Sequence, residues 1–472
     1  MGDPRYDDNK SYKDDEATCD MMTGAKNFFW NVVAKGVPLT DYKITEYTPI
    51  ETIDIPDIVA IHLQQHIGAP NEPIVKVGEE VKVGQKIGDS KSFVSAPVHA
   101  SISGTVSAIK KEIHPSLGRR STAILIRSDG NDQWVKGEKI RDLSEKTKEE
   151  LIKMIREAGI VGLGGAAFPT SVKLSPKDKI DTLIINGCEC EPYITADHRS
   201  MLENGERIIK GAEIFMNILG AERTIIAIED NKPDAIAKMK DLVEKFGMEK
   251  MEVSKLKTRY PQGFEKMLIK TVLNREVPLR VNGRPGLPAN VGTIVQNVGT
   301  AKAAYDAVYE GKPLVERVLT VTGGVKEPKN LLVRVGTRFS SLIEACGGFR
   351  DEPGKMIMGG PMMGLCQINP RTPTIKGTNC LLVLGKETVK KEEETLCIRC
   401  GSCVEVCPVN LIPTDLARYA RNRRFDLCEE NYIDACMGCG ACSYVCPSKI
   451  PLAQLIGWAK DEVGRRKNDC KS

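Results

Sequence analysis

The sequence has no long hydrophobic run, few aromatic residues and almost no net charge. Aromatic residues make up 5% of its 472 residues, and 67 Lys and Arg face 63 Asp and Glu, a formal net charge of +4. Positive and negative side chains are nearly equal in number, and this balance does not indicate a nucleic-acid-binding surface. The longest charge-free stretches, 92–109 and 286–301, are interrupted by Ser, Gly or Pro. We therefore expect neither a nucleic-acid partner nor a transmembrane span in this chain.

The start of the chain also lacks the apolar core of a signal peptide, because residues 1–20 are acidic and polar. Without export, the 16 cysteines are not expected to form a disulfide framework. Eight of them lie in two groups between Cys397 and Cys446, and the others are scattered. This distribution indicates a reducing compartment in which the grouped cysteines bind metal.

The length of the chain and the changes of residue pattern along it predict a multidomain α/β protein. We expect five regions: an N-terminal segment (1–47), a β barrel-sandwich domain (48–135), a doubly wound domain (140–315), a smaller β-rich domain (316–385) and a cysteine-rich helical domain (386–472). The N-terminal segment carries an aromatic group, Phe28-Phe29-Trp30, which could contact a membrane or a partner but more often packs on the following domain. Its role stays open.

The barrel-sandwich region is predicted from strand-like alternation between glycines. Residues 75–88 alternate apolar and polar side chains, as half-buried strands do. The region resembles lipoyl or biotinyl modules, with Lys91 near the position of their modified lysine. The flanking methionines of those modules are missing, so we interpret Lys91 as an ordinary surface lysine.

The central region alternates helices and strands, which predicts a largely parallel, doubly wound, Rossmann-like sheet. The expected elements are helices over 148–158, 201–219 and 233–246 and strands over 180–185 and 223–228. A strand over 317–322 opens the smaller β-rich domain, which is closed by a glycine-rich turn at 359–364.

Two cysteine runs at the C-terminal end form an internal repeat. Each has the spacing C-x-x-C-x-x-C-x-x-x-C-P, from Cys397 to Pro408 and from Cys436 to Pro447. In two-cluster ferredoxins, three closely spaced thiolates bind one 4Fe–4S cluster and the fourth cysteine binds the other. The spacing thus predicts one cluster on Cys397, Cys400, Cys403 and Cys446, and a second on Cys436, Cys439, Cys442 and Cys407. Structural zinc sites usually show two separated pairs and fit this spacing poorly.

Two loops of the central region suggest a cofactor site. The glycine-rich loop at 162–169 follows a predicted helix and departs from the G-x-G-x-x-G spacing, so from residues alone a phosphate site and a structural turn remain equal alternatives. The predicted strand at 180–185 is followed by Asn186, Glu189 and Glu191. Ligands of doubly wound sheets lie beyond the carboxyl ends of strands, so two carboxylates there are well placed to contact polar groups of a cofactor, whereas for either Glu alone a solvated acidic turn would be favoured.

These loops resemble the flavin-binding subunit of respiratory complex I. The resemblance rests on Gly162-x-Gly164-Gly165-Ala-Ala-Phe168-Pro169-Thr170 with Lys173, and on Asn186-x-x-Glu189-x-Glu191-Pro192. With the barrel-sandwich start and the cysteine repeat, residues from about 65 to 447 resemble the C subunit of the Rnf electron-transport complex. The segment Val321-Thr322-Gly323-Gly324-Val325 followed by Pro328 is similar to an SLBB (soluble-ligand-binding β-grasp) domain.

The resemblance implies a non-covalent FMN that reacts with NADH, together with two 4Fe–4S clusters. Glu191 would be the catalytic residue and would orient the nicotinamide. The cofactor-binding residues would be Gly162, Gly164, Gly165, Phe168, Lys173, Asn186, Glu189, Glu191, Gly263, Glu265, Asn297 and Thr300. Leu163, Cys188 and Phe264 depart from the complex I pattern.

The function that the resemblance implies is that of a peripheral Rnf subunit, a component of a ferredoxin:NAD+ oxidoreductase at the cytoplasmic face of the bacterial membrane. It would pass electrons between NAD(H), FMN and the clusters, with integral and peripheral subunits of the complex as partners. Two alternatives remain: a cobalamin reductase of a bacterial microcompartment, which resembles the same subunit, and a flavin-free iron–sulfur electron relay.

Overall fold

The computed structural model describes residues 35–281, 284–389 and 392–469. The aromatic group predicted at 28–30 lies outside these residues. Within them, no helix is both long and apolar enough to cross a membrane.

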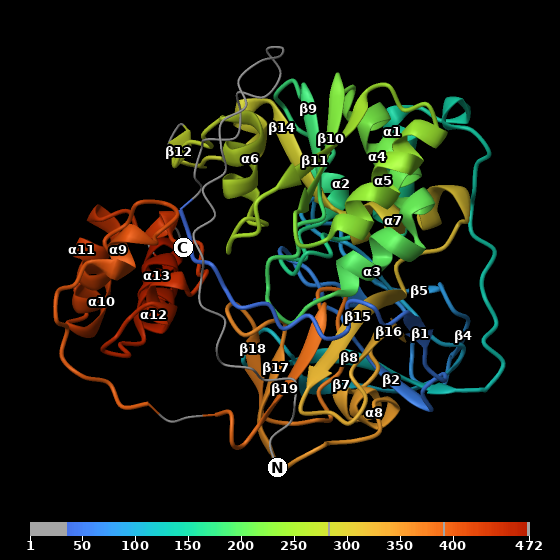
Figure 1. Ribbon diagram of the computed structural model, residues 1–472. Coiled ribbons are helices and arrows are strands. Elements are labelled where there is room, and N and C mark those ends of the chain that lie inside the picture. The colour runs from blue at the N-terminus through green and yellow to red at the C-terminus, as the bar shows by residue number, and fades with distance from the viewer. Residues whose placement is uncertain (1–34, 282–283, 390–391, 470–472) are drawn as a thin grey trace. The chain divides into compact units, whose positions relative to one another are not determined.

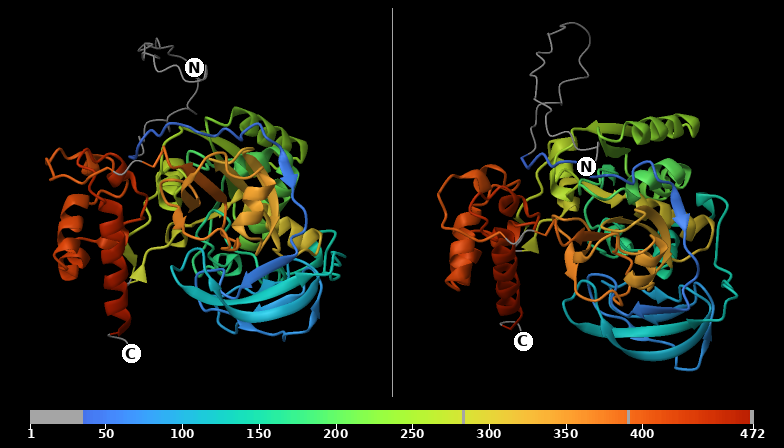
Figure 2. Two further views of the ribbon diagram at one scale, coloured as in Figure 1. Left: turned by 90° about the horizontal axis from the view of Figure 1, so that it is seen from below. Right: turned by 60° about the horizontal axis from the view of Figure 1, so that its bottom comes forward.

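The barrel-sandwich domain consists of two small sheets around one apolar core. Its alternating sequence buries Val59 and Ile61 together with their register partners Ile126 and Ile124, which lie side by side on the inner face of one sheet. One sheet has the order β2 (Ile58–His62), β8 (Arg120–Ser128), β7 (Gly104–Ile113), β4 (Glu80–Val81), and the other β3 (Glu72–Pro73), β5 (Lys86–Asp89), β6 (Val98–His99). Both views of Figure 2 show these blue and cyan strands as one closed group. The predicted architecture is confirmed.

The central domain contains a parallel sheet with the strand order β11-β10-β9-β14. Its strands are β9 (Thr182–Asn186), β10 (Arg223–Glu229), β11 (Met251–Leu256) and β14 (Thr293–Asn297). The chain adds β10 and β11 on one side of β9 and then returns to place β14 on the other side. The order therefore reverses between β9 and β14, where doubly wound sheets bind ligands.

Helices cover both faces of this sheet because its strands are apolar on both faces. Leu183 and Ile185 of β9 lie in the larger core, with the helices α1, α4, α5 and α7, and Ile184 lies in the other core with α6. The bounds are α1 (Lys148–Glu157), α2 (Thr170–Lys173), α3 (Ala196–Glu203), α4 (Gly205–Leu219), α5 (Pro233–Lys245), α6 (Glu265–Leu273) and α7 (Val298–Tyr309). Figure 1 shows the helices around the green strands.

The helix predicted over 201–219 is two helices in the structure. It is interrupted at Asn204, whose φ of −121° and ψ of 21° are not helical. The close approach of α5 accounts for a small residue next to the break, because a Cβ on Gly205 would lie 2.5 Å from Leu242 Cδ1. Helix α3 thereby begins at Ala196, directly after the carboxylate loop 186–195.

The SLBB domain is a six-stranded mixed sheet with one helix, α8 (Phe339–Ala345). Its order is β1 (Ile50–Thr52), β16 (Lys329–Arg334), β15 (Glu316–Gly323), β19 (Cys380–Gly385), β17 (Pro353–Met358), β18 (Leu365–Gln367). Strand β1 comes from residues near the start of the chain, yet it pairs in parallel with β16. The residue limits of the five regions stay predictions.

The C-terminal domain is helical and repeats itself in the backbone. Its helices are α9 (Ser402–Glu405), α10 (Pro413–Arg421), α11 (Phe425–Glu430), α12 (Ala441–Tyr444) and α13 (Leu452–Asp469). Three equivalent pairs adopt left-handed φ values: Arg399 and Gly438, Gly401 and Gly440, Asn410 and Lys449. The two cysteine runs are therefore equivalent in conformation as well as in spacing.

Candidate functional site

A cavity of about 390 Å³ opens beyond the carboxyl ends of β9 and β14. Asn186 and Asn297, the last residues of these strands, are register partners and both line it. The glycine loop 162–169 and the carboxylate loop contribute to its wall, together with Tyr260 and Phe264. Its volume lies in the range of about 300–1,000 Å³ that is usual for small-molecule sites. The cavity therefore lies at the switch point of the sheet.

Glycines account for much of the cavity surface. A side chain at Gly360 would place its Cβ 2.2 Å from Glu191 Oε2, and one at Gly164 would lie 3.6 Å from Asn297 Cβ. Backbone walls of this kind let a flat ring approach closely and expose N–H groups to a phosphate. The lining glycines are Gly164, Gly165, Gly263, Gly359, Gly360, Gly364 and Gly377. These residues fit a flavin nucleotide.

The two glutamates of the carboxylate loop are each held by backbone N–H groups. Glu189 accepts from the N–H groups of Asp197 at 2.7 Å and His198 at 3.1 Å, so it binds the N-terminus of α3. Glu191 accepts from Met362 at 3.2 Å and Met363 at 2.9 Å, so it fastens the SLBB loop 359–364 to the cavity. Burial raises the pKa of Glu191.

Two buried lysines support the carboxylate loop from behind. Lys43 donates to the carbonyl oxygens of Glu189 at 3.0 Å, Glu191 at 2.9 Å and Ile194 at 2.6 Å. Lys232 donates to the carbonyl of Cys188 at 2.6 Å. Burial lowers the pKa of Lys43, and the neighbouring Lys232 adds to the effect. The segment 35–48 is thus a structural part of the site.

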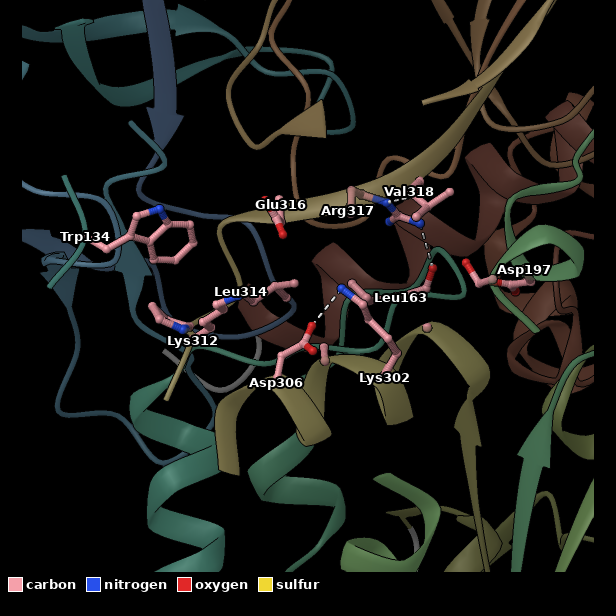
Figure 3. Close-up of a pocket in the computed structure, with 14 residues that line it drawn as sticks. Trp134, Leu163, Asp197, Lys302, Asp306, Lys312, Leu314, Glu316, Arg317 and Val318 are labelled. Atoms are coloured by element: carbon pink, nitrogen blue, oxygen red, sulfur yellow. Dashed lines mark hydrogen bonds and ion pairs between the residues drawn. The ribbon is translucent and has the colours of Figure 1, made fainter. Parts of the chain in front are cut away.

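The glycine loop is anchored through the backbone of Leu163. Its N–H donates to Thr300 Oγ1 at 2.9 Å, and its carbonyl accepts from Arg317 Nη2 at 3.4 Å. Behind the loop lies a second cavity of about 40 Å³ (Figure 3), where Arg317 points toward Leu163 and Lys302 pairs with Asp306 at 2.7 Å. Burial lowers the pKa of Arg317 to about 10. Thr300 of α7 in the central domain and Arg317 of β15 in the SLBB domain therefore fix this loop.

Asp197 lines both cavities and was not among the predicted site residues. Its Oδ2 accepts from Asn297 Nδ2 at 2.6 Å. Burial and the neighbouring Glu189 raise the pKa of Asp197 well above its usual range. The hydrogen bond joins the first turn of α3 to the N-cap of α7.

The structure brings seven predicted cofactor-binding residues to the cavity wall and leaves five outside it. Those that line it are Gly164, Gly165, Asn186, Glu189, Glu191, Gly263 and Asn297. Of the others, Gly162 donates to the Phe168 carbonyl at 2.9 Å and closes the base of the glycine loop, and Thr300 anchors that loop. Lys173 contacts the Glu265 carboxylate and donates to the Val295 carbonyl at 2.9 Å. Their predicted ligand contacts stay predictions.

Sequence reasoning missed the part of the wall that comes from other domains. The SLBB domain contributes residues of 358–365 and 377–379, and the barrel-sandwich domain contributes Ser116. The glycine-rich turn at 359–364 was a visible signal, although it was interpreted only as the end of a domain. Nothing in the sequence marked Lys43 or Arg317.

The cysteines Cys407, Cys436, Cys439 and Cys442 line one small cavity of about 30 Å³. Its remaining lining is apolar and includes Leu411 and Ile456. Burial raises the pKa of Cys439 to about 11 and of Cys442 to about 12. In the described residues no group of His, Cys, Asp or Glu is arranged for a single metal ion. The donor set suits a 4Fe–4S cluster, which binds four thiolates in a largely apolar site.

The first cysteine run lies closer to the surface. Cys397 and Cys400 are exposed, whereas Cys403 and Cys446 are buried and lie in one apolar cluster. Their neighbours Leu396 and Ile398 are 90% and 68% exposed. The two runs thus differ in exposure although their backbones match.

Tyr260 joins the large cavity to the second cysteine run. It lines the cavity, is itself buried, and donates its hydroxyl to the carbonyl of Cys439 at 2.7 Å. Cys190 and Met362 pack in the same apolar cluster as Tyr260 and Cys439. The cavity and the cysteine loop therefore share a wall.

Family models match successive parts of the chain. The RnfC barrel sandwich hybrid domain matches residues 31–131 and the Nuo51 FMN-binding domain residues 155–306. The SLBB domain matches residues 318–365 and the 4Fe-4S dicluster domain residues 396–450. The cofactors of the chain are therefore FMN and two 4Fe–4S clusters.

Curated relatives match most of the chain. The C subunit of the proton-translocating ferredoxin:NAD(+) oxidoreductase complex of Clostridium ljungdahlii is 49% identical over 83% of this chain and 84% of its own. The C subunit of the Na(+)-translocating complex of Acetobacterium woodii is 45% identical over 80% and 84%. The C subunit of the ion-translocating oxidoreductase complex of Rhodobacter capsulatus is 42% identical over 80% and 73%. The chain therefore belongs to the family of C subunits of ion-translocating ferredoxin:NAD(+) oxidoreductase complexes, the Rnf complexes.

Proposed function

We propose that this chain is the NAD(H)-reacting peripheral subunit of an Rnf complex, acting within a ferredoxin:NAD+ oxidoreductase. It exchanges electrons between NAD(H), FMN and two 4Fe–4S clusters. The observation that carries the proposal is the wall that the switch-point cavity shares with a cluster-binding loop, through the hydrogen bond from Tyr260 to Cys439. When bound, FMN accepts a hydride from NADH and can pass the two electrons on singly.

The residues of the cavity divide the work of holding FMN. The glycine loop and the N-terminus of α7 offer backbone N–H groups and a favourable dipole to the phosphate. Among the described lining residues there is no Lys or Arg, so the backbone supplies the positive potential inside the cavity. Asn186 and Asn297 present amide groups at the strand ends. Lys173 remains our candidate for a cation that approaches the phosphate once it leaves Glu265.

Glu191 is our candidate for the residue that orients the nicotinamide. Its carboxylate lies at the cavity wall, where it is fixed by two backbone N–H groups. The proposal includes Phe168 and Glu265 as outer contacts of NADH, on the resemblance alone. The residues exclude water and position the reactants, and no side chain has to act as a general base.

The cluster ligands are the eight cysteines of the two runs, exchanged between runs at the fourth position. The shared cavity of Cys407 with Cys436, Cys439 and Cys442 supports this arrangement. Cys446 lies in an apolar cluster with Cys403 of the first run, as the same exchange requires.

The partners that we propose are the integral and peripheral subunits of the complex, at the cytoplasmic face of the cell membrane. The names of the relatives as subunits of ion-translocating complexes support the assembly with such partners, and the cytoplasmic face is part of the proposal. Two of those names differ in the ion, proton in one and Na(+) in the other, so they do not select an ion for this chain.

The test is a flavin and iron assay on the purified, reconstituted chain, followed by NADH titration. We expect FMN after gentle isolation, bleaching of its absorbance by NADH, and NADH-dependent reduction of an artificial dye. A chain that loads both clusters but never takes up FMN would be a flavin-free relay. Efficient NADH-driven cobalamin reduction without membrane partners would instead favour the cobalamin reductase.

A further inference from the structure

The two cysteine runs contact the rest of the chain differently. The loop of the second run meets the cavity wall at Tyr260, which donates to the carbonyl of Cys439, and it approaches the loop 359–364, where the carbonyl of Met362 lies beside Gly440. A Cβ on Gly440 would lie 2.9 Å from Met362 O, whereas a Cβ on the equivalent Gly401 would meet nothing within 4 Å. Only one of two matched loops is therefore fitted to the cavity.

The first run has the opposite surroundings. Cys397 and Cys400 are exposed and are flanked by the exposed apolar side chains of Leu396 and Ile398. Electron transfer between proteins needs a centre near the surface, and electron transfer within a chain needs the shortest bonded route. The first run lies near the surface, as transfer between proteins requires. The second run is joined to the cavity by a short bonded route, as transfer within the chain requires.

We infer that the second-run cluster is the one that exchanges electrons with the cavity, that the first-run cluster exchanges them with a partner protein, and that Tyr260 is the positioning residue of the inner junction. This inference rests on the proposed function. For each NADH oxidised to NAD+ and a proton, two electrons cross the junction one after the other, and each reduces one cluster by one electron. In the reverse direction the same electrons and proton re-form NADH.

Tyr260 performs two tasks in this junction. Its ring lines the cavity and its hydroxyl holds the cluster loop, so it connects the two sites through bonds and a single hydrogen bond. Hydrogen bonding around a cluster also tunes its reduction potential. Removal of the hydroxyl leaves the buried carbonyl of Cys439 without this donor.

The first experiment compares Tyr260→Phe with Tyr305→Phe, which removes a hydroxyl on α7. In flavin-free protein loaded with both clusters, an EPR-monitored redox titration should show a shifted potential for one cluster in Tyr260→Phe and none in Tyr305→Phe. In flavin-loaded protein, the rate of cluster reduction by NADH, taken relative to the rate of flavin bleaching in the same sample, should fall severalfold in Tyr260→Phe and stay unchanged in Tyr305→Phe. Unchanged potential and rate would overturn the role of Tyr260.

The second experiment fixes the order of the clusters with matched variants at equivalent positions. In Cys397→Ser, NADH should still reduce the remaining second-run cluster. In Cys436→Ser, the remaining first-run cluster should be reduced by dithionite but not by NADH. NADH reduction of that cluster at the wild-type rate would overturn the order.

Gly440→Ala against Gly401→Ala repeats the comparison without touching a ligand. Both glycines have φ near 80°, at 78° and 83°, so the backbone strain is equal and only Gly440→Ala presses on Met362. We expect slower NADH-driven cluster reduction in Gly440→Ala alone, and equal rates would count against the inner junction. If NADH fails to bleach the flavin of the wild type, the proposed function fails, and the flavin-free titration still decides whether Tyr260 contacts a cluster.

Discussion

Replacing Lys43 by Met tests whether the segment 35–48 belongs to the flavin site. The ammonium group of Lys43 donates to three carbonyl oxygens of the carboxylate loop, at 3.0, 2.9 and 2.6 Å. Leaving a buried acceptor without a donor costs about 1–3 kcal/mol, so three part-buried or buried carbonyls cost roughly 3–9 kcal/mol. Methionine also removes a charge whose burial is unfavourable, as the lowered pKa of Lys43 indicates, and this offsets part of the cost. We expect the carboxylate loop, in the conformation that Lys43 holds, to be destabilised by about 3 kcal/mol net.

This loss should appear mainly as weaker FMN binding. FMN would contact this loop in the conformation that Lys43 holds, so the apparent Kd rises by the factor by which that conformation is depopulated, and about 3 kcal/mol corresponds to at most roughly 100-fold. Quenching of flavin fluorescence during titration of the apoprotein measures it. Lys35→Met is the matched control, because Lys35 lies in the same segment and its hydrogen bond to Asn410 is exposed. A Kd for Lys43→Met within threefold of the wild type would refute the reasoning.

Three further predictions concern Gly360 of the cavity wall, the buried Lys376 and the cluster ligand Cys407. Gly360→Ala should weaken FMN binding, because its Cβ would lie 2.2 Å from Glu191 Oε2 and overpacking costs about 1–3 kcal/mol. The same fluorescence titration measures this effect, and an unchanged Kd would contradict the close packing of Gly360 on Glu191. Burial lowers the pKa of Lys376 to about 7, so stability should rise between pH 7 and the unfolded value of 10.5, by up to about 5 kcal/mol. Urea unfolding of Lys376→Met should lack that rise, and a parallel pH profile would contradict it. Cys407→Ser should remove the cluster of the opposite run, which iron analysis and EPR would detect; loss of the first-run cluster alone would contradict the exchange.

The sign of the pH effect follows from proton binding. Between about pH 7 and 10.5 the unfolded chain holds the proton of Lys376 and the folded chain does not. The stabilisation is therefore complete above the unfolded pKa and is lost as the pH falls through the folded value. The ammonium is enclosed by the carbonyls of Pro97 at 2.7 Å and Gly159 at 2.6 Å, which are not enough to offset its burial.

The parts of the site that the sequence predicted are those with a short-range signature. The cysteine spacing indicated the repeat and its exchange because cluster geometry dictates close intervals. The loops at 162–169 and 186–191 were visible because glycine and carboxylate patterns after regular elements have few explanations. In the central domain, periodicity predicted α1, α4, α5, β9 and β10, with α3 merged into α4 across the break at Asn204; β11, β14, α6 and α7 were not predicted.

The parts that were missed depend on contacts between distant segments. The SLBB loop 359–364 completes the cavity wall by donating two backbone N–H groups to the carboxylate of Glu191, and no local pattern specifies that pairing. Lys43 looks in the sequence like one more surface lysine, yet it is 6% exposed. Lys173 matched a family motif, but its ammonium contacts Glu265 and Val295 in the described structure. Side-chain partners are set by packing, which single-sequence patterns do not contain.

The pairing of β1 with β16 has a consequence for the order in which the protein is made. The ribosome delivers Ile50 early, but the strand that receives it ends at Arg334, and Asn330 also donates to the carbonyls of Thr45 and Thr48. The segment that carries Lys43 therefore lacks its strand partner through most of synthesis, and unpaired strand edges are prone to aggregation. The cysteine repeat closes through neighbours of its own and needs no such delay. A nascent chain halted before residue 330 should thus be unable to retain flavin, which makes cofactor loading a late step in the maturation of the subunit.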